Sequence, residues 1–336
     1  MRYLVTGGAG FIGSHTVDEL VRCGHQVTVL DDLSTGKEEN LADAYRMRKI
    51  EDVRDRIDFI RGTITDRDTL DRACRGVDVV LHLAAQTSVP HSVQDPLETN
   101  RINVDGTFLV LLAARDAGVR RVVFASSCAV YGETQNLPKC SVVPKREDMP
   151  PEPVSPYAVS KLVGELYGGV FHRVSGMEFV ALRYFNVFGS RQNPGSPYSG
   201  VLSLFCTAMR DGGKPNVNGP TVYGDGEQSR DFIFIEDIVQ GNILACETPG
   251  IAGMVLNLGT GRRYTLNQTL RLLEKFSGRP ANARYAPPRP GDIRDSQADI
   301  SLAREKLGFD PRVRFEEGLR RTWDWYCAAP QAEACS

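Results

Sequence analysis

Short apolar, β-branched runs alternate with longer segments of helical period through the first half of the chain. The runs predict strands at residues 3–6, 27–30, 58–60, 77–83, 122–126 and 179–183, with helices filling most of the intervals. This alternation is the pattern expected of successive βαβ units, which build a parallel sheet covered by helices on both faces. The sequence therefore predicts an α/β fold, a Rossmann-type doubly wound parallel sheet.

The alternation weakens beyond about residue 190, where Gly/Pro-rich loops separate shorter elements. This change predicts a smaller C-terminal lobe of mixed α/β structure packed on the sheet. We place the first domain at residues 1–185, the smaller lobe at 186–327, and a tail at 328–336, and we expect the chain to pass between the two lobes.

Composition narrows the class of protein. A chain of 336 residues with 41% hydrophobic residues can bury a sizeable core, and its 40 basic and 42 acidic residues argue against a nucleic-acid or membrane-surface partner. The start of the chain lacks the features of a secretory signal and no apolar run approaches the ~20 residues that span a bilayer, so we expect a cytoplasmic protein. The 8 cysteines are dispersed without metal-site spacing, which predicts reduced thiols and no metal.

The first strand ends in TGGAGFIG, which predicts a phosphate-binding turn. Gly7 would allow the tight turn, Gly10 would let a pyrophosphate approach the backbone, and Gly13 would let the following helix pack closely. The second strand ends at Asp31, about where a carboxylate binds the adenosine ribose of a dinucleotide. The alternative is a solvated turn residue. Because a carboxylate would repel the extra phosphate of NADP, the position favours NAD.

The segment SPYAVSK places Tyr157 and Lys161 on one face of a predicted helix. A phenol needs about 4 kcal/mol of differential stabilisation to ionise near neutrality, and a lysine beside an oxidised nicotinamide would supply it. The alternative is a simple surface pair. Upstream, Ser126 and Ser127 stand at the carboxyl end of a predicted parallel strand, where such sheets bind ligands. The alternative is that both serines satisfy backbone groups; this stays open for Ser126, and we take Ser127 as the functional hydroxyl.

Eight motifs together carry a family resemblance that covers nearly the whole chain: TGGAGFIGSH, VLDDLSTGK, HLAAQTSVPHS, SSCAVYG, SPYAVSK, LRYFNVFGSRQNP, GDGEQSRDFIFIEDI and RPGDIRDSQAD. The chain resembles the extended short-chain dehydrogenase/reductases, and most closely the UDP-hexose and UDP-N-acetylhexosamine 4-epimerases. The resemblance implies an isomerase with tightly bound NAD, an NAD-binding first domain and a nucleotide-sugar-binding lobe. It also implies a homodimer, formed through helices at about residues 98–117 and 156–174.

The resemblance also assigns catalytic and cofactor residues. Tyr157 becomes the general base, Lys161 its partner and a ligand of the nicotinamide ribose, and Ser127 the group that orients the sugar 4'-OH. The implied cofactor-binding residues are Gly7, Gly10, Phe11, Ile12, Gly13, Asp31, Asp32, Ser34, Thr35, Gly36, Ile64, Leu83, Ala84, Ala85, Thr87, Asn103, Ser126, Tyr157, Lys161 and Tyr184. One departure is Thr63, which stands where relatives carry the aspartate that contacts adenine.

The resemblance places the UDP-sugar on residues from both lobes. They are Ser88, Val89, Ser127, Cys128, Tyr157, Asn186, Tyr223, Arg230, Arg289, Asp292 and Ser296. The two arginines would bind the diphosphate, for which a guanidinium is well shaped, and Asp292 the uridine ribose. For Arg230 a salt bridge to Asp231 or Asp237 is the alternative, and Tyr223 is as readily a core aromatic.

Ser296 bears on substrate size. By resemblance, epimerases confined to plain hexoses carry a bulky tyrosine at this position. The smaller serine side chain leaves room for an N-acetyl group on the sugar. We therefore expect UDP-GlcNAc and UDP-GalNAc as substrates, alongside UDP-Glc and UDP-Gal, with C4' oxidised to a 4-keto sugar that rotates before hydride returns.

Particular residues disfavour three alternative functions. A UDP-glucuronate 4-epimerase or decarboxylase is disfavoured by Asn186, where such relatives tend to carry threonine. A dehydratase would have an acidic pair where this chain has Cys128 and Ala129. A non-catalytic dinucleotide-sensing protein is disfavoured by the intact set of Ser127, Tyr157 and Lys161.

Overall fold

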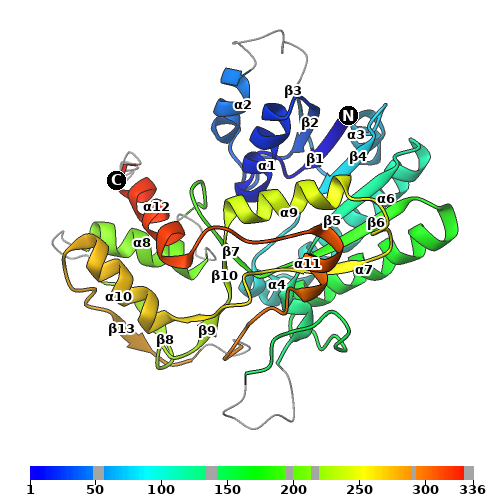
Figure 1. The fold of residues 1–336 in the computed structure, drawn as a ribbon. Coiled ribbons are helices and arrows are strands. Elements are labelled where there is room, and N and C mark those ends of the chain that lie inside the picture. The colour runs from blue at the N-terminus through cyan, green and yellow to red at the C-terminus, as the bar shows by residue number, and fades with distance from the viewer. Residues whose placement is uncertain (48–56, 134–141, 194–199, 213–218, 289–292, 329–336) are drawn as a thin grey trace.

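The computed structural model describes residues 1–47, 57–133, 142–193, 200–212, 219–288 and 293–328. Its centre is a parallel seven-stranded sheet in the order β11-β6-β5-β4-β1-β2-β3 (Figure 1). The strands are β1 (Arg2–Thr6), β2 (Gln26–Asp31), β3 (Ile57–Arg61), β4 (Val79–His82), β5 (Arg121–Ser127), β6 (Glu178–Tyr184) and β11 (Val255–Leu258). The predicted doubly wound fold is confirmed, and the strand order reverses direction between β1 and β4, where such sheets bind ligands.

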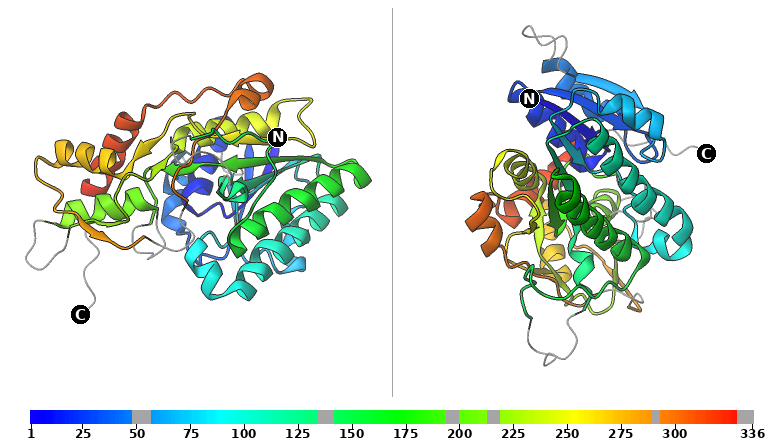
Figure 2. Two further views of the ribbon diagram at one scale, coloured as in Figure 1. Left: turned by 90° about the horizontal axis from the view of Figure 1, so that it is seen from below. Right: turned by 90° about the vertical axis from the view of Figure 1, so that its right-hand side faces the viewer.

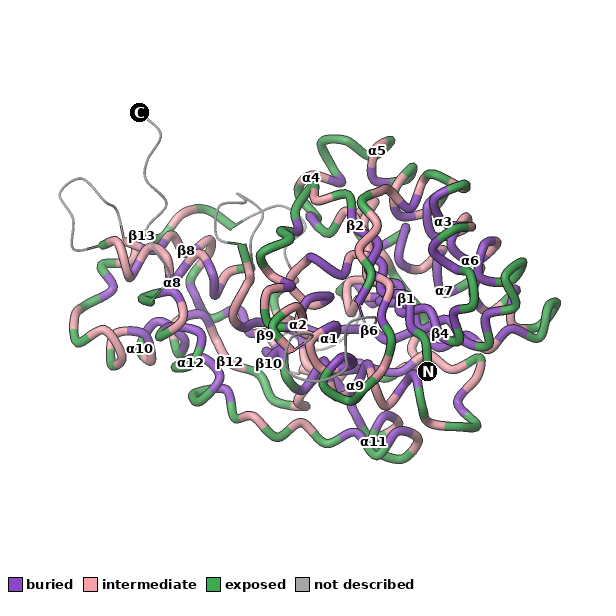
Figure 3. Tube along the Cα trace, turned by 90° about the horizontal axis from the view of Figure 1, so that it is seen from above, coloured by how far each residue is buried: buried purple, intermediate pink, exposed green. Residues whose placement is uncertain are grey.

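Helices cover both faces of this sheet (Figure 2). One face packs on α1 (Phe11–Arg22), α9 (Ile235–Glu247) and α11 (Ser301–Leu307); the other packs on α3 (Arg67–Ala73), α6 (Gly106–Asp116) and α7 (Pro156–Ser175). Along β1 the side chains alternate between the two cores, as the period of a strand requires: Tyr3 and Val5 lie in one, Leu4 in the other. Figure 3 shows the buried residues gathered along these central strands.

Short helical elements follow three of the central strands. They are η1 (Glu38–Leu41) and α2 (Ala42–Met47) after β2, α4 (Val89–Gln94), α5 (Pro96–Asn100) and the π-helical turn η2 (Arg101–Asp105) after β4, and η3 (Cys128–Tyr131) after β5.

The smaller lobe has its own core, which lies beside the carboxyl ends of the sheet. It is built from β7 (Asn186–Phe188), α8 (Val201–Asp211), β8 (Thr221–Tyr223), β9 (Ser229–Arg230), β10 (Phe232–Phe234), β12 (Tyr264–Thr265), α10 (Leu266–Ser277), β13 (Arg284–Ala286) and α12 (Phe315–Ala328). Phe188, Phe232 and Phe315 pack together there, with ring centroids 5.2–6.2 Å apart.

The six predicted strands correspond to β1–β6, with ends that differ by at most two residues. The seventh strand, β11, was not predicted. It follows α9 and pairs in parallel with β6, so a segment after residue 190 completes the first sheet. No helix of the described residues is long and apolar enough to cross a membrane. The six described cysteines are free thiols.

Candidate active site

The turn after β1 is shaped by its glycines. Gly7 has φ +70°, and a Cβ there would lie 2.8 Å from the backbone of Ala84; a Cβ on Gly13 would lie 2.1 Å from the carbonyl oxygen of Gly7. Gly10 differs, because within 4 Å a Cβ there would meet only that carbonyl, at 3.1 Å. Gly10 is also the N-cap of α1 and provides no side-chain cap. This open approach to a helix N-terminus fits a diphosphate.

Asp31 lies at the end of β2 beside this turn. Its carboxylate accepts hydrogen bonds from the backbone N–H of Ala9 at 2.9 Å and of Leu33 at 2.8 Å, and the residue is 7% exposed. Burial raises its pKa, against the effect of these hydrogen bonds. Asp31 is therefore buried and is not the solvated turn residue that we considered as the alternative.

The loop after Asp31 contains four more of the residues assigned to the cofactor. Asp32 accepts a hydrogen bond from the backbone N–H of Ser34 at 2.9 Å, and Asp32, Ser34 and Thr35 are exposed. Gly36 is buried against the glycine turn, where a Cβ would lie 2.9 Å from the carbonyl carbon of Ala9. The three exposed residues keep their polar groups accessible beside the turn.

The opposite wall follows β4. Leu83, Ala84 and Ala85 are partly buried there and Thr87 is exposed. Asn103 holds this wall: its amide accepts from the backbone N–H of Gln86 at 2.8 Å and donates to the carbonyl of Gln86 at 2.9 Å and to the Ser160 hydroxyl at 3.0 Å. The structure thus places the Asn103 side chain in a supporting position between this wall and α7.

Four further residues assigned to the cofactor lie in α1, in the segment after β3 and at the end of β6. Phe11 and Ile12, in the first turn of α1, are partly buried and pack against the core of the smaller lobe. Ile64 is buried, and Gly106 leaves room for it, because a Cβ at Gly106 would lie 2.8 Å from its Cδ1. Tyr184 donates its hydroxyl to Asn242 of α9 at 2.6 Å.

Thr63, the residue that departs from the family pattern, makes a local contact with Thr65, two residues later in the chain. Its hydroxyl lies 3.1 Å from that of Thr65 and accepts a hydrogen bond from the Thr65 backbone N–H at 3.3 Å.

Three successive residues at the end of β5 contact three residues on one face of α7. The Lys161 ammonium donates to the carbonyl of Ala125 at 2.8 Å, the Ser126 hydroxyl donates to the Glu165 carboxylate, and the Ser127 hydroxyl shares a hydrogen bond with the Tyr157 phenol. The contacts follow from geometry, because Tyr157, Lys161 and Glu165 are spaced four residues apart and the helix lies along the strand. Ser127, Tyr157 and Lys161 are therefore brought together.

Burial controls the charge states of this set. Lys161 is 4% exposed, its ammonium lies 5.0 Å from the ring centre of Phe124, and burial lowers its pKa to about 7. Burial raises the pKa of Tyr157 to about 12, opposed by the hydrogen bond from Ser127. The protein groups thus favour the phenol over the phenolate, and a positive charge at the nicotinamide would act in the opposite direction. The Lys161 ammonium lies 5.9 Å from the ring centre of Tyr157, and because Lys161 is buried the two are not a simple surface pair.

Ser126 belongs to a buried polar network that the sequence did not reveal. The Glu165 carboxylate accepts from Arg183 Nε at 2.9 Å and Nη2 at 2.7 Å, and both side chains are 5% exposed. The Arg183 guanidinium also lies 4.6 Å from the ring centre of Tyr131. The Ser126 side chain therefore faces the supporting network. The available signal was Arg183, a charged residue in the otherwise uncharged run 179–184.

The substrate side of the site joins η3 to the smaller lobe. Ser296 is 7% exposed, and its hydroxyl shares a hydrogen bond with the Cys128 thiol, whose pKa is raised to about 11 by burial. Asn186 begins β7, and its side-chain oxygen is buried without a hydrogen-bond partner among the described residues. A buried amide oxygen of this kind fits a ligand donor group.

Arg230 donates from Nη1 to the carbonyls of Ser229 at 2.8 Å and Arg294 at 3.1 Å. The carboxylates of Asp231 and Asp237, considered above as salt-bridge partners of Arg230, accept hydrogen bonds from backbone N–H groups. Those of Thr260, Gly261 and Ala298 donate to Asp231, and those of Arg312 and Val313 donate to Asp237.

Three of the remaining substrate positions lie in the described part of the chain. Ser88 is buried and caps α4 by accepting from the His91 backbone N–H at 3.0 Å, and Val89 is 37% exposed. Tyr223 is partly buried on β8 beside the core residue Val222. Arg289 and Asp292 lie outside the described residues.

Comparisons with known proteins consistently match this chain to epimerases. Residues 3–259 match the model of the NAD dependent epimerase/dehydratase family. A curated relative, a putative UDP-glucose 4-epimerase of Methanocaldococcus jannaschii, is 36% identical over 324 residues, which is 96% of this chain and 97% of the relative.

Two solved structures are similar over nearly their whole length. A UDP-glucose 4-epimerase of Thermotoga maritima with UDP-glucose has a TM-score of 0.86 and 38% identity, covering 97% of this chain and 98% of the other. A UDP-N-acetylglucosamine 4-epimerase of Methanobrevibacter ruminantium in complex with UDP-N-acetylmuramic acid has a TM-score of 0.86 and 40% identity, covering 97% of each chain.

Proposed function

Because this chain belongs to the NAD dependent epimerase/dehydratase family and is an NAD-dependent isomerase, we propose that it interconverts the 4-epimers of UDP-sugars. The observation that carries the proposal is the alignment of β5 with α7, which brings Ser127, Tyr157 and Lys161 together at the carboxyl edge of the sheet. The similarity to 4-epimerases over 96% or more of the chain supports it.

The residues present fit NAD. Gly10 leaves the approach to α1 open for the diphosphate, and Asp31 lies beside it for the adenosine ribose. When bound there, NAD supplies the acceptor and later the donor of a hydride.

The protein groups divide the remaining chemistry. Tyr157 removes the proton of the 4'-hydroxyl while Ser127 holds that hydroxyl in position, and the Lys161 ammonium stabilises the resulting phenolate. The 4-keto sugar then turns, and return of the proton to the 4'-oxygen together with return of the hydride to the other face of C4' gives the epimer. Lys161 is 4% exposed, so water screens the charge of its ammonium only weakly.

We further propose that the substrates include UDP-GlcNAc and UDP-GalNAc alongside UDP-Glc and UDP-Gal. Ser296 and Cys128 form one small-residue wall of the site, because the serine hydroxyl and the thiol are in hydrogen-bond contact. A tyrosine at this position would fill the space that an N-acetyl group needs. Arg230, Arg289 and Asp292 are proposed for the UDP group.

UDP-glucuronate is the second candidate substrate. Asn186 disfavours it, because relatives that act on UDP-glucuronate tend to carry threonine at this position. Incubation of the purified protein with UDP-Gal, UDP-GalNAc and UDP-glucuronate in separate reactions, followed by separation of the products, distinguishes these substrates. Release of carbon dioxide from UDP-glucuronate would identify a decarboxylase instead.

We also propose a homodimer. Large apolar side chains are exposed on adjacent helices α4, α5 and α7, which is unusual for a surface that faces water. They include Val93 at 64%, Leu97 at 82%, Val159 at 45%, Leu166 at 62%, Val170 at 42% and Val174 at 76% exposure. A second copy of this chain would bury them.

A further inference from the structure

Arg191 lies in the loop after β7 with an unusual backbone conformation. Its φ is +64°, a region that few residues other than glycine adopt. The residue belongs to the motif LRYFNVFGSRQNP, and the proposed reaction gives it no role. A strained residue that is kept in place by its surroundings points to a task for its side chain.

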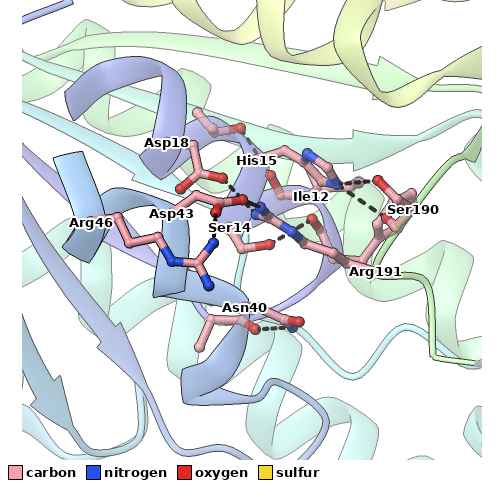
Figure 4. A network of polar contacts seen from close by, with 12 residues as sticks. Ile12, Ser14, His15, Asp18, Asn40, Asp43, Arg46, Ser190 and Arg191 are labelled. Atoms are coloured by element: carbon pink, nitrogen blue, oxygen red, sulfur yellow. Dashed lines mark hydrogen bonds and ion pairs between the residues drawn. The ribbon is translucent and has the colours of Figure 1, made fainter. Parts of the chain in front are cut away.

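The Arg191 side chain joins two helices of the NAD-binding domain (Figure 4). Its Nη1 lies 2.7 Å from Asp18 Oδ2 in α1, and its Nη2 lies 2.8 Å from Asp43 Oδ2 in α2. The Arg191 and Asp18 side chains are 15% and 18% exposed, so water screens this pair less than a surface pair. The planar guanidinium suits a bridge between two carboxylates.

A second set of contacts fixes the other end of the same segment. The carbonyl of Ala9, in the glycine turn, accepts hydrogen bonds from the Lys37 backbone N–H at 3.0 Å and from Asn40 Nδ2 at 2.9 Å. The chain between Asp31 and Asp43 is therefore attached to the turn at Ala9 and to α1 through Arg191. This stretch contains the loop of residues 32–36 that we assign to the adenosine ribose.

The loop that carries Arg191 has its own attachment to α1. His15 Nε2 lies 3.1 Å from the carbonyl oxygen of Ser190, which can only accept, so this nitrogen carries the proton. Burial and the charge of Arg191 lower the pKa of His15 to about 4, which keeps the ring neutral near pH 7. The backbone next to Arg191 is thus held on α1 independently of the ion pairs.

We propose that Arg191 is a positioning residue for cofactor retention: by bridging Asp18 and Asp43 it holds α2 and the ribose-binding loop against α1, and so slows the release of NAD. The inference rests on the proposed function only in taking the bound dinucleotide as a cofactor that must survive many turnovers. It adds a residue outside the cofactor pocket to those that determine how tightly NAD is held.

The test compares Arg191→Asn with Arg46→Ala. Asparagine tolerates the left-handed backbone region, so the first variant removes the bridge with little added strain. Arg46 pairs with the same Asp43 at 3.2 Å but is 78% exposed. Because both residues lie in α2, this pair does not join α2 to α1, and Arg46 is therefore the matched control. NAD is measured by its absorbance after acid release from the purified holoenzyme, and its dissociation rate by trapping released cofactor.

We expect the NAD dissociation rate of R191N to rise at least about tenfold, which corresponds to about 1.4 kcal/mol, and that of R46A to match wild type. Asp43→Asn, which removes one arm of the bridge at an exposed position, is expected to give a smaller rise. Excess NAD should restore the kcat of R191N toward UDP-Gal with an unchanged KM.

Unaltered NAD release in both R191N and D43N, or equal acceleration in R46A, would overturn the proposal. If circular dichroism shows that R191N does not fold, the NAD dissociation rates of D43N and R46A are compared instead. A faster rate in D43N than in R46A would then support the proposal, and equal rates would overturn it. The retention measurement needs no turnover, so it remains informative if the chain acts on none of the UDP-sugars and the proposed function is wrong.

Discussion

The carboxylate of Glu165 and the guanidinium of Arg183 form a doubly hydrogen-bonded ion pair directly behind the reacting groups, at 2.7 and 2.9 Å. Glu165 lies one helical turn beyond Lys161 on α7, and the same carboxylate accepts from Ser126, the residue before Ser127. One buried anion thus ties β5, β6 and α7 together. We infer that it fixes the position of Tyr157 and Lys161 relative to Ser127.

Replacing Glu165 by Gln tests this support. The variant leaves Arg183 buried without a counter-charge, so we expect a loss of about 3 kcal/mol of unfolding free energy in urea. We also expect kcat to fall about tenfold or more with little change in KM, because displacement of the reacting groups costs rate rather than binding.

Glu316→Gln is the control for Glu165→Gln. It removes a pair with Lys275 whose side chains are 70% and 55% exposed, and it is expected to change stability by less than about 1 kcal/mol. A Glu165→Gln protein that is destabilised but keeps the wild-type kcat would show that the pair is only structural.

Ser296→Tyr tests the assignment of substrate size. The phenol would occupy the space beside Cys128, so turnover of UDP-GalNAc is expected to fall about a hundredfold while that of UDP-Gal changes about threefold or less. Ser296→Ala keeps the space and should retain both activities. Equal losses on the two substrates in S296Y would mean that Ser296 does not face the substituent at C2'.

Acid stability follows from His15. Its folded pKa, about 4, lies below the unfolded value of 6.5, so the unfolded chain binds the extra proton between these values and the free energy of unfolding falls as pH decreases through this window. From pH 7 to pH 5 this contributes about 2 kcal/mol of lost stability. Urea unfolding at both pH values should show a smaller loss for His15→Gln, and an identical loss in both proteins would contradict the assignment.

Leu166→Glu tests the dimer. A charge on the apolar surface of α7 should give a monomer by light scattering, because the partner could not bury it without a counter-ion. Tyr285→Glu places the same charge at an exposed aromatic of the smaller lobe, 55% exposed, and should leave the assembly unchanged. A Leu166→Glu protein with the mass of wild type would locate the interface elsewhere.

The sequence was most informative where local pattern and structure coincide. Strands such as β5 were predicted because their apolar runs are continuous, and the Tyr157/Lys161 pair because helical spacing alone brings it to one face. β11 was missed, since its four residues carry little pattern of their own and pair with β6, about seventy positions earlier in the chain.

The supporting contacts were missed for a related reason. The partners of Glu165 and Arg191 are set by the packing of elements that are distant in sequence, which no spacing rule reports. The size of the pocket around Ser296 was inferred from the residue type, while its neighbour Cys128 became apparent only in the folded chain.

The most direct test of the account is the interconversion of UDP-Gal and UDP-Glc, and of UDP-GalNAc and UDP-GlcNAc, by wild type and by Tyr157→Phe. The account predicts that wild type forms the 4-epimer of each substrate without added NAD. It predicts a fall in kcat of at least about a hundredfold in Y157F with its NAD retained, because the phenol that moves the proton is gone. Unchanged turnover in Y157F, or no epimerisation of any UDP-sugar by NAD-loaded wild type, would contradict it.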